Sequence, residues 1–102
     1  MIEMDYTKVM GVVQSYATLI ESKYPGVTPA PMDASFAKLH SHHVPILTEY
    51  RHHLWMCCEI MRGDMSLAKA MRWLGWLNFF IYQKGWMTLD EIKDLSRPDP
   101  NG

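Results

Sequence analysis

The stretch Arg72-Trp-Leu-Gly-Trp-Leu-Asn-Phe-Phe-Ile-Tyr82 decides the fold of this chain. It has the length of a helix, and its apolar side chains would cover almost every side of that helix. A helix that is apolar all round does not lie on the surface of a small globular domain, because each side needs a neighbour that excludes water. Those neighbours come from the same chain or from further copies of it. The stretch therefore predicts a helical protein that self-associates.

The composition limits the size and the class of the protein. The chain has 102 residues, of which 48% are hydrophobic and 21% are charged, and these values are typical of one folded domain with a modest core. We expect a single helical domain over residues 1–102, with residues 98–102 flexible. The formal net charge is -1 and no block of like charge stands out. Direct binding to nucleic acid or to an acidic membrane is not expected, because it usually requires a basic patch.

Two further stretches, residues 5–23 and 45–62, repeat apolar side chains at steps of three and four residues. This is the period of an amphipathic helix. Pro25-Gly26 ends the first stretch and Gly63 ends the second. Pro45 takes the favoured first position of the second helix, because its missing N–H has no partner to lose there. Two long helices are therefore expected before the decisive one.

The decisive helix is predicted to start at a cap, Asp64 or Ser66, and to end at Gly85. Short helices are expected over residues 33–39 and after Thr88-Leu-Asp-Glu91, which has the form of a capping box. Sustained two-residue alternation, the mark of a strand, is absent from the sequence. The predicted class is all-α: a compact bundle of three long helices plus short helices.

Imidazole and thiol groups lie close together in the sequence and are the usual ligands of zinc. His53 and Cys57 would lie one turn apart on a helix, whereas His40, His42 and His43 precede the break at residue 45. Neither a Cys-x-x-Cys nor a His-Glu-x-x-His pattern is present, so the favoured interpretation is structural or solvent-facing histidines. His53 and Cys57 remain weak candidates for a metal site or a catalytic pair. We expect no cofactor and no enzyme.

The location of the protein is indicated by its cysteines and by the length of its apolar stretches. Cys57 and Cys58 are adjacent and cannot form an ordinary disulfide with each other, and free thiols suit a reducing cytoplasm. The apolar run over residues 73–82 is far shorter than the roughly 20 residues that cross a bilayer. We expect a cytoplasmic protein that does not enter membranes.

One side of the decisive helix carries a candidate ligand site. Lys69, Arg72, Trp76 and Gln83 project within about 60° of one another, and the spacing of Arg72 and Trp76 lets the guanidinium pack on the indole. Such a ledge can hold a nucleobase and a phosphate, and His53, or His52 in its place, is a further candidate for a binding pocket. The alternative, an Arg stem that covers a Trp at the rim of the core, is the more frequent arrangement.

The opposite side carries a candidate interface. Met71, Gly75, Asn78 and Tyr82 form a stripe in which Gly75 lets another helix approach closely, within the protomer or between protomers. Four Trp, five Tyr and three Phe are also difficult to bury within one domain of this size. The predicted interface includes three more aromatic residues of the same helix: Trp73, Phe79 and Phe80.

The C-terminal half, roughly residues 45–98, resembles a family of small helical proteins encoded by tailed bacteriophages. The resemblance is carried by three stretches: Tyr50-Arg-His-His-Leu-Trp-Met-Cys57, Lys69-x-x-Arg-Trp-Leu-Gly75 and Thr88-x-Asp-Glu-x-x-Asp-x-x-Arg97-Pro98. In that family the second stretch commonly continues Arg-Trp-Leu-Gly-x-x-Gln-Gly, whereas this chain has Asn78 and Phe79 in the last two places. Most members have no assigned activity, so the resemblance implies a viral origin and a host-cytoplasm setting more than a mechanism.

Three functions are compatible with these features. The first is a phage accessory protein that binds and inhibits a host or anti-phage defence protein as a helical homo-oligomer. The alternative is a protein that sequesters a small signalling nucleotide in pockets at the oligomer interface, using Lys69, Arg72 and Trp76. The third is a metal-dependent enzyme built around His53 and Cys57. The sequence favours the first, because no catalytic or phosphate-binding motif is present.

Overall fold

The computed structural model of the chain describes residues 5–32 and 45–96. These residues form four helices and no strand, which confirms the all-α class. The helices are α1 (Tyr6–Lys23), α3 (Ile46–Met61), α4 (Leu67–Gln83) and the short α5 (Leu89–Ser96). The predicted helix over residues 33–39 and the predicted flexible end over residues 98–102 lie outside the described residues. None of the four helices is long and apolar enough to cross a membrane.

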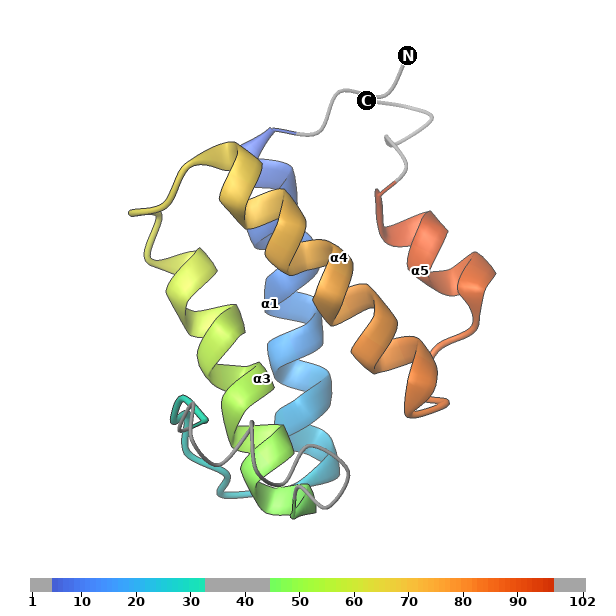
Figure 1. Cartoon of the computed structure of the whole chain (residues 1–102). Helices are drawn as coiled ribbons and strands as arrows, with labels where there is room; N and C mark the ends of the chain where they lie inside the picture. The colour runs from blue at the N-terminus through green and yellow to red at the C-terminus, as the bar shows by residue number, and fades with distance from the viewer. Residues whose placement is uncertain (1–4, 33–44, 97–102) are drawn as a thin grey trace.

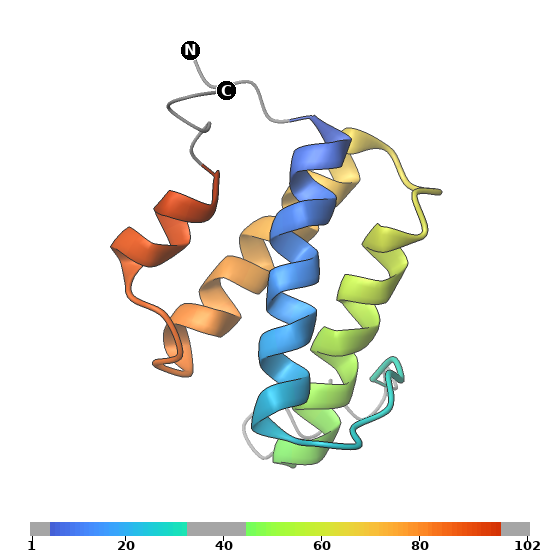
Figure 2. The same cartoon turned by 180° about the vertical axis from the view of Figure 1, so that it is seen from behind.

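Helices α1 and α4 each contact all three of the other helices, and α1 makes the more extensive contacts. Figure 1 shows α4 crossing in front of α1, with α3 on one side and α5 on the other. The view from behind in Figure 2 confirms that α3 and α5 flank α1 on opposite sides. One side of α4 therefore faces α1, and the other side faces away from the described part of the bundle.

The core lies where α1 meets the other helices. Val9, Val13, Tyr16 and Ile20 recur at steps of three and four residues, so that they form one buried stripe along α1. The other helices contribute the following buried residues to the same core: Tyr50, Leu54, Met56, Cys57 and Ile60 of α3, Ala70, Leu74, Leu77, Phe80 and Ile81 of α4, and Ile92 of α5.

The starts of α4 and α5 follow the predicted caps, the start of α1 is capped by Asp5, and the start of α3 differs from the prediction. The side chains of Asp5 and Ser66 each accept a hydrogen bond from the N–H three residues further on, at 2.8 and 3.1 Å. Pro45 has an extended backbone, with φ -58° and ψ 143°, so α3 begins at Ile46 and not at the proline as predicted. Because its ψ angle is extended, Pro45 is not part of α3 but is the residue directly before the first turn of the helix.

The ends of the helices depend on glycines, as predicted. Gly63 and Gly85 adopt positive φ angles of 78° and 73°, a conformation that terminates α3 and α4 and that side chains disfavour. The capping box of α5 is formed: the Thr88 N–H donates to Glu91 Oε1 at 2.9 Å, and the Glu91 N–H donates to Thr88 Oγ1 at 3.1 Å. The hydrogen bond from the Thr88 N–H to the carboxylate lowers the pKa of Glu91.

Candidate functional site

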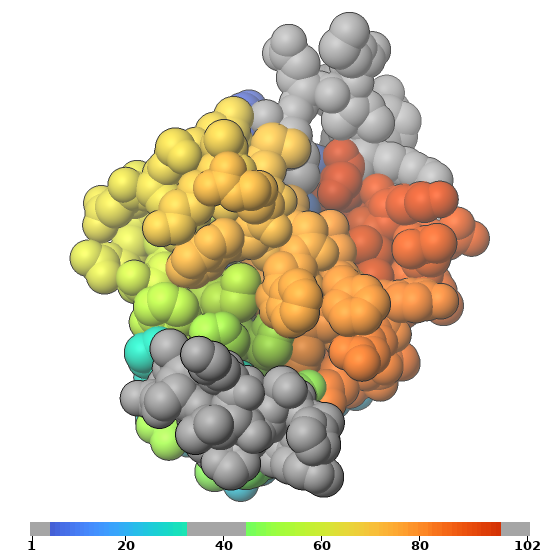
Figure 3. Space-filling model, viewed as in Figure 1, coloured from blue at the N-terminus to red at the C-terminus, as the bar shows by residue number. Residues whose placement is uncertain are grey.

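The two sides of α4 differ in their exposure. Of the nine large apolar residues that are exposed on the described part of the chain, five belong to α4. Met71, Phe79 and Tyr82 are 43%, 52% and 52% exposed, and with Gly75 they lie within an arc of about 80° around the helix axis. We refer to these four residues as the α4 outer face. Figure 3 shows the side chains of α4 across the middle of this view, uncovered by α3 or α5.

The predicted helix-crossing stripe is divided between the two sides. A Cβ atom added to Gly75 would meet nothing within 4 Å, so no described element crosses α4 at this glycine. Asn78 instead lies against α1, where its Oδ1 accepts a hydrogen bond from the hydroxyl of Tyr16 at 2.5 Å. Burial raises the pKa of Tyr16 to about 12, so the hydroxyl keeps its proton and remains a donor. Asn78 thus belongs to the α1–α4 crossing inside the protomer, while Met71, Gly75 and Tyr82 face outward.

Two of the aromatic residues predicted for the interface lie inside the protomer. Phe80 is buried, and its ring stacks on that of His53 with centroids 3.7 Å apart. Trp73 is half-buried and packs against Trp55 of α3. Both side chains point toward α3. Trp73 lies four residues before the buried Leu77 and Phe80 lies three residues after it, so the three residues share one side of α4. The structure therefore places Phe80 in the protomer's own core, in contrast to the prediction, has Trp73 half-buried against α3, and leaves Phe79 on the outside.

Trp76 is exposed but is held in place by His53. The indole N–H of Trp76 donates to His53 Nε2 at 2.8 Å, and His53 Nδ1 lies 2.7 Å from the carbonyl oxygen of Glu49. Because an indole nitrogen only donates, Nε2 is the unprotonated acceptor and Nδ1 carries the proton. Burial lowers the pKa of His53 to about 4, with a smaller lowering from His52 and Lys84 and an opposing effect of Glu49. The imidazole is therefore neutral at pH 7.

The two residues of the weakly predicted metal site, His53 and Cys57, are engaged within the bundle. Both ring nitrogens of His53 have a partner, and Cys57 is fully buried, which raises the pKa of its thiol to about 12. Within residues 5–32 and 45–96, no group of three or more His, Cys, Asp or Glu side chains is arranged to hold a metal ion. The remaining histidines of the predicted cluster lie outside the described residues: His40, His42 and His43.

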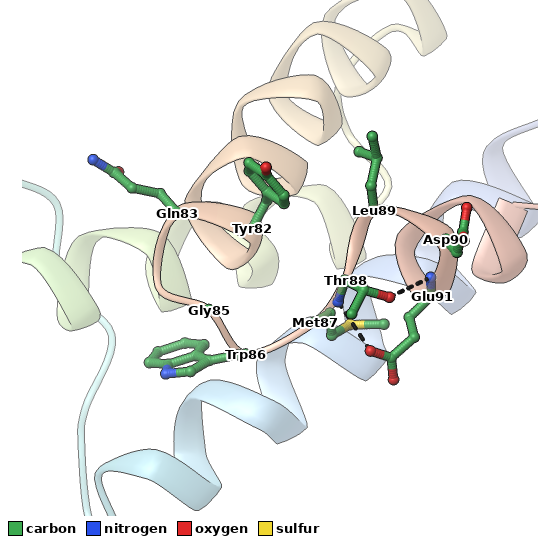
Figure 4. Close-up of a pocket in the computed structure, with 9 residues that line it drawn as sticks. All are labelled: Tyr82, Gln83, Gly85, Trp86, Met87, Thr88, Leu89, Asp90 and Glu91. Atoms are coloured by element: carbon green, nitrogen blue, oxygen red, sulfur yellow. Dashed lines mark hydrogen bonds between the residues drawn. The ribbon is translucent and has the colours of Figure 1, made fainter.

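The predicted ligand ledge is only partly assembled. Arg72, Trp76 and His53 line one groove between α3 and α4. The Lys69 ammonium lies 5.1 Å over the Trp73 ring, so the cation–π pair here is not the predicted pair of Arg72 with Trp76. Gln83 lines a separate hollow at the α4–α5 connection, where Figure 4 shows it pointing away from the other labelled side chains. The groove therefore keeps three of the five predicted ligand residues.

The groove also contains residues that the sequence analysis did not select. These are Met32, Trp55 and Met56, which line it together with Trp73 and with His52, the alternative to His53 as a predicted pocket residue. His52 and Trp55 are three residues apart on α3, and their rings stack with centroids 5.7 Å apart. This spacing was visible in the sequence. Met32 comes from the connector after α1, and no local pattern places it there.

Comparison of the chain with protein-family models, with curated proteins and with solved structures found no match. The resemblance to tailed-phage proteins therefore stays a prediction. What the structure provides is geometry: an outward apolar face on α4, an aromatic groove beside it and a fixed Trp76 between the two.

Proposed function

We propose that the protein acts by stoichiometric binding, as a homodimer joined through the α4 outer face, and without catalysis. The observation that carries this proposal is the exposure of Met71, Phe79 and Tyr82 around Gly75. Contiguous apolar surface of this kind is costly in water and usually marks an interface. A second copy is the occupant that we propose, and two features of the chain support it.

The first feature is the open space at Gly75. A glycine at the centre of an apolar helix face lets a second helix approach closely, as in ridges-into-grooves packing. If two copies of α4 cross in antiparallel orientation at Gly75, Met71 of one copy lies opposite Phe79 of the other, and Tyr82 lies opposite Ala68. The face is then complementary to itself, which a two-fold interface requires.

The second feature is the charge near the two ends of α4. Lys69 and Arg72 lie in the N-terminal half of α4, whereas Asp90 and Glu91 lie at the start of α5, next to the C-terminal end of α4. Figure 4 shows Tyr82 and Asp90 on the same side of the α4–α5 connection. An antiparallel crossing brings the basic end of each copy toward the acidic end of the other. A parallel crossing would place like charges together.

The target of the proposed dimer is a host or anti-phage defence protein, which the dimer would inhibit in the host cytoplasm. This part of the proposal rests on the resemblance to tailed-phage proteins. It is supported by the arrangement of the described titratable groups, since His53 is neutral and engaged at both nitrogens and Cys57 is a protonated, buried thiol. These groups stabilise the bundle and offer no nucleophile or general base.

Gly75 provides the test of the dimer. In Gly75→Leu the new side chain projects from the outer face into open space, so the protomer still folds, but the close crossing is blocked. Light scattering should report a dimer for the wild type and a monomer for Gly75→Leu. Gly11→Leu is the matched control, because Gly11 is also a helical glycine with open space around it, on α1. Its mass should equal that of the wild type.

The same variants test the binding of a target. A stoichiometric host protein should co-purify with the wild type and with Gly11→Leu, and should be lost from Gly75→Leu. A wild type that is monomeric at micromolar concentration would rule out the homodimer. A dimer that retains no stoichiometric partner from lysates of susceptible hosts would leave the dimer standing and would contradict the inhibitor function.

A further inference from the structure

A groove of about 480 Å³ lies between α3 and the first half of α4, within one protomer. Its volume falls within the range of small-molecule sites. Three indoles, those of Trp55, Trp73 and Trp76, contribute to its walls, and Trp76 is 53% exposed. The groove is thus an aromatic site with one ring that is both accessible and fixed by a hydrogen bond.

The two histidines of the groove carry no charge at neutral pH. His53 Nε2 is an acceptor for Trp76, as described above. His52 Nδ1 accepts a hydrogen bond from the backbone N–H of Met32 at 3.0 Å, which requires an unprotonated nitrogen. Burial lowers the pKa of His52 as well. These imidazoles therefore act as fixed aromatic and polar wall, not as cations.

The edge of the groove is positive. Arg72 is the one charged residue among its described lining residues, and no carboxylate is among them. The Lys69 ammonium lies close by, over the Trp73 ring. A guanidinium beside an aromatic wall suits an anion that is attached to a flat ring, because the ring stacks while the guanidinium binds the anion through two hydrogen bonds.

We propose that this groove binds a planar aromatic ring that carries an anionic group. The ring stacks on the indole of Trp76, and the anion pairs with Arg72. The anion is a phosphate, as in a nucleotide, or a carboxylate. This site goes beyond the proposed homodimer, since it is complete within one protomer, whereas the ligand pockets predicted from the sequence lie at the oligomer interface.

Isothermal titration of the full chain tests the proposal with four probes. AMP supplies a ring with a phosphate, and indole-3-acetate supplies a ring with a carboxylate, so the better binder of the two identifies the anion. Adenosine and inorganic phosphate supply the ring and the anion alone, and each should bind at least about tenfold more weakly. Arg72→Gln should weaken binding of the better probe by about tenfold to hundredfold.

Arg62→Gln is the matched control, because Arg62 is an exposed arginine outside the groove that pairs with Glu59 and Asp64. It should bind like the wild type. Gly75→Leu should also retain binding, which separates this proposal from the dimer. The proposal is overturned if neither AMP nor indole-3-acetate binds up to millimolar concentration, or if Arg72→Gln leaves the affinity of the better probe unchanged.

Discussion

The inner and outer sides of α4 belong to the same helix and are similarly apolar, yet only one of them is used to fold the protomer. Leu74, Leu77 and Ile81 are buried in the core. Met71 and Phe79, on the other side, are about half-exposed. The difference teaches that hydrophobicity alone does not separate residues that stabilise a protomer from residues that bind a partner. Which side of α4 is buried is decided by α1, which packs on the inner side and leaves the outer side exposed.

The largest expected effect is on the inner side. Leu77→Ala removes a fully buried side chain and leaves a cavity between α4 and its neighbours, so it should lower the free energy of unfolding by about 2–5 kcal/mol. Urea unfolding measures this change as a lower midpoint with an unchanged slope. The measurement is best made in the Gly75→Leu background, where unfolding is not coupled to dissociation of the proposed dimer. A loss below about 1 kcal/mol would show that the inner side is not well packed.

Trp76 lies at the boundary between the two sides, and the hydrogen bond that it donates to His53 depends on pH. The pKa of His53 falls from 6.5 to about 4 on folding, so the unfolded chain binds a proton between these values and the folded chain does not. The contribution of His53 to the free energy of unfolding is therefore fully present above pH 6.5 and is lost as the pH falls toward 4. The free energy of unfolding should drop by about 2 kcal/mol between pH 7 and pH 5. His52, whose pKa is also lowered, acts in the same direction.

His53→Gln is the control for this pH dependence. A glutamine amide offers one acceptor and one donor in place of the two ring nitrogens but does not titrate. Most of the loss between pH 7 and pH 5 should disappear in this variant, and the smaller contribution of His52 should remain. If the wild type and His53→Gln lose equal free energy of unfolding between pH 7 and pH 5, the pH dependence does not come from protonation of His53.

Much of the fold could be predicted from local signals. Ser66, Gly63, Gly85 and the capping box at Thr88 predicted helix ends, because each acts through hydrogen bonds or dihedral angles within a few residues. The apolar period predicted which stretches are helical, but not which side of α4 meets α1. Helical spacing groups residues on one helix and contains no information about the element that packs on them.

The candidate site shows the same limit. Arg72 and Trp76 were selected because they share one helix, but the partner that fixes Trp76 is His53, which is 23 residues earlier in the chain and on α3. The stripe of Met71, Gly75, Asn78 and Tyr82 predicted a helix crossing within the protomer or between protomers, and its spacing did not indicate that Asn78 pairs with Tyr16 of α1 while the other three residues face outward. Contacts between helices depend on the crossing geometry, which the sequence pattern does not encode.

A smaller effect is expected at the polar contact of the inner side. Tyr16→Phe removes the donor to Asn78 Oδ1 and leaves that oxygen without its partner next to the core, so it should cost about 1–2 kcal/mol of unfolding free energy. Tyr82→Phe, on the outer face, is the matched control and should change the stability of the monomeric background by less than about 0.5 kcal/mol. Equal costs for the two tyrosines would contradict the assignment of Tyr16 to a buried hydrogen bond.

The smallest effect on the protomer is expected from Phe79→Ser, on the outer face. Phe79 is 52% exposed, so its loss leaves little cavity, and the unfolding free energy of the Gly75→Leu background should change by less than about 0.5 kcal/mol. In the wild-type background the same change should weaken dimerisation at least about tenfold, because a large ring at the centre of the crossing is lost. Sedimentation measures this second effect. If Phe79→Ser instead destabilises the monomer as much as Leu77→Ala, the ring is part of the protomer's own core, and the two sides of α4 do not differ in the way that their exposure indicates.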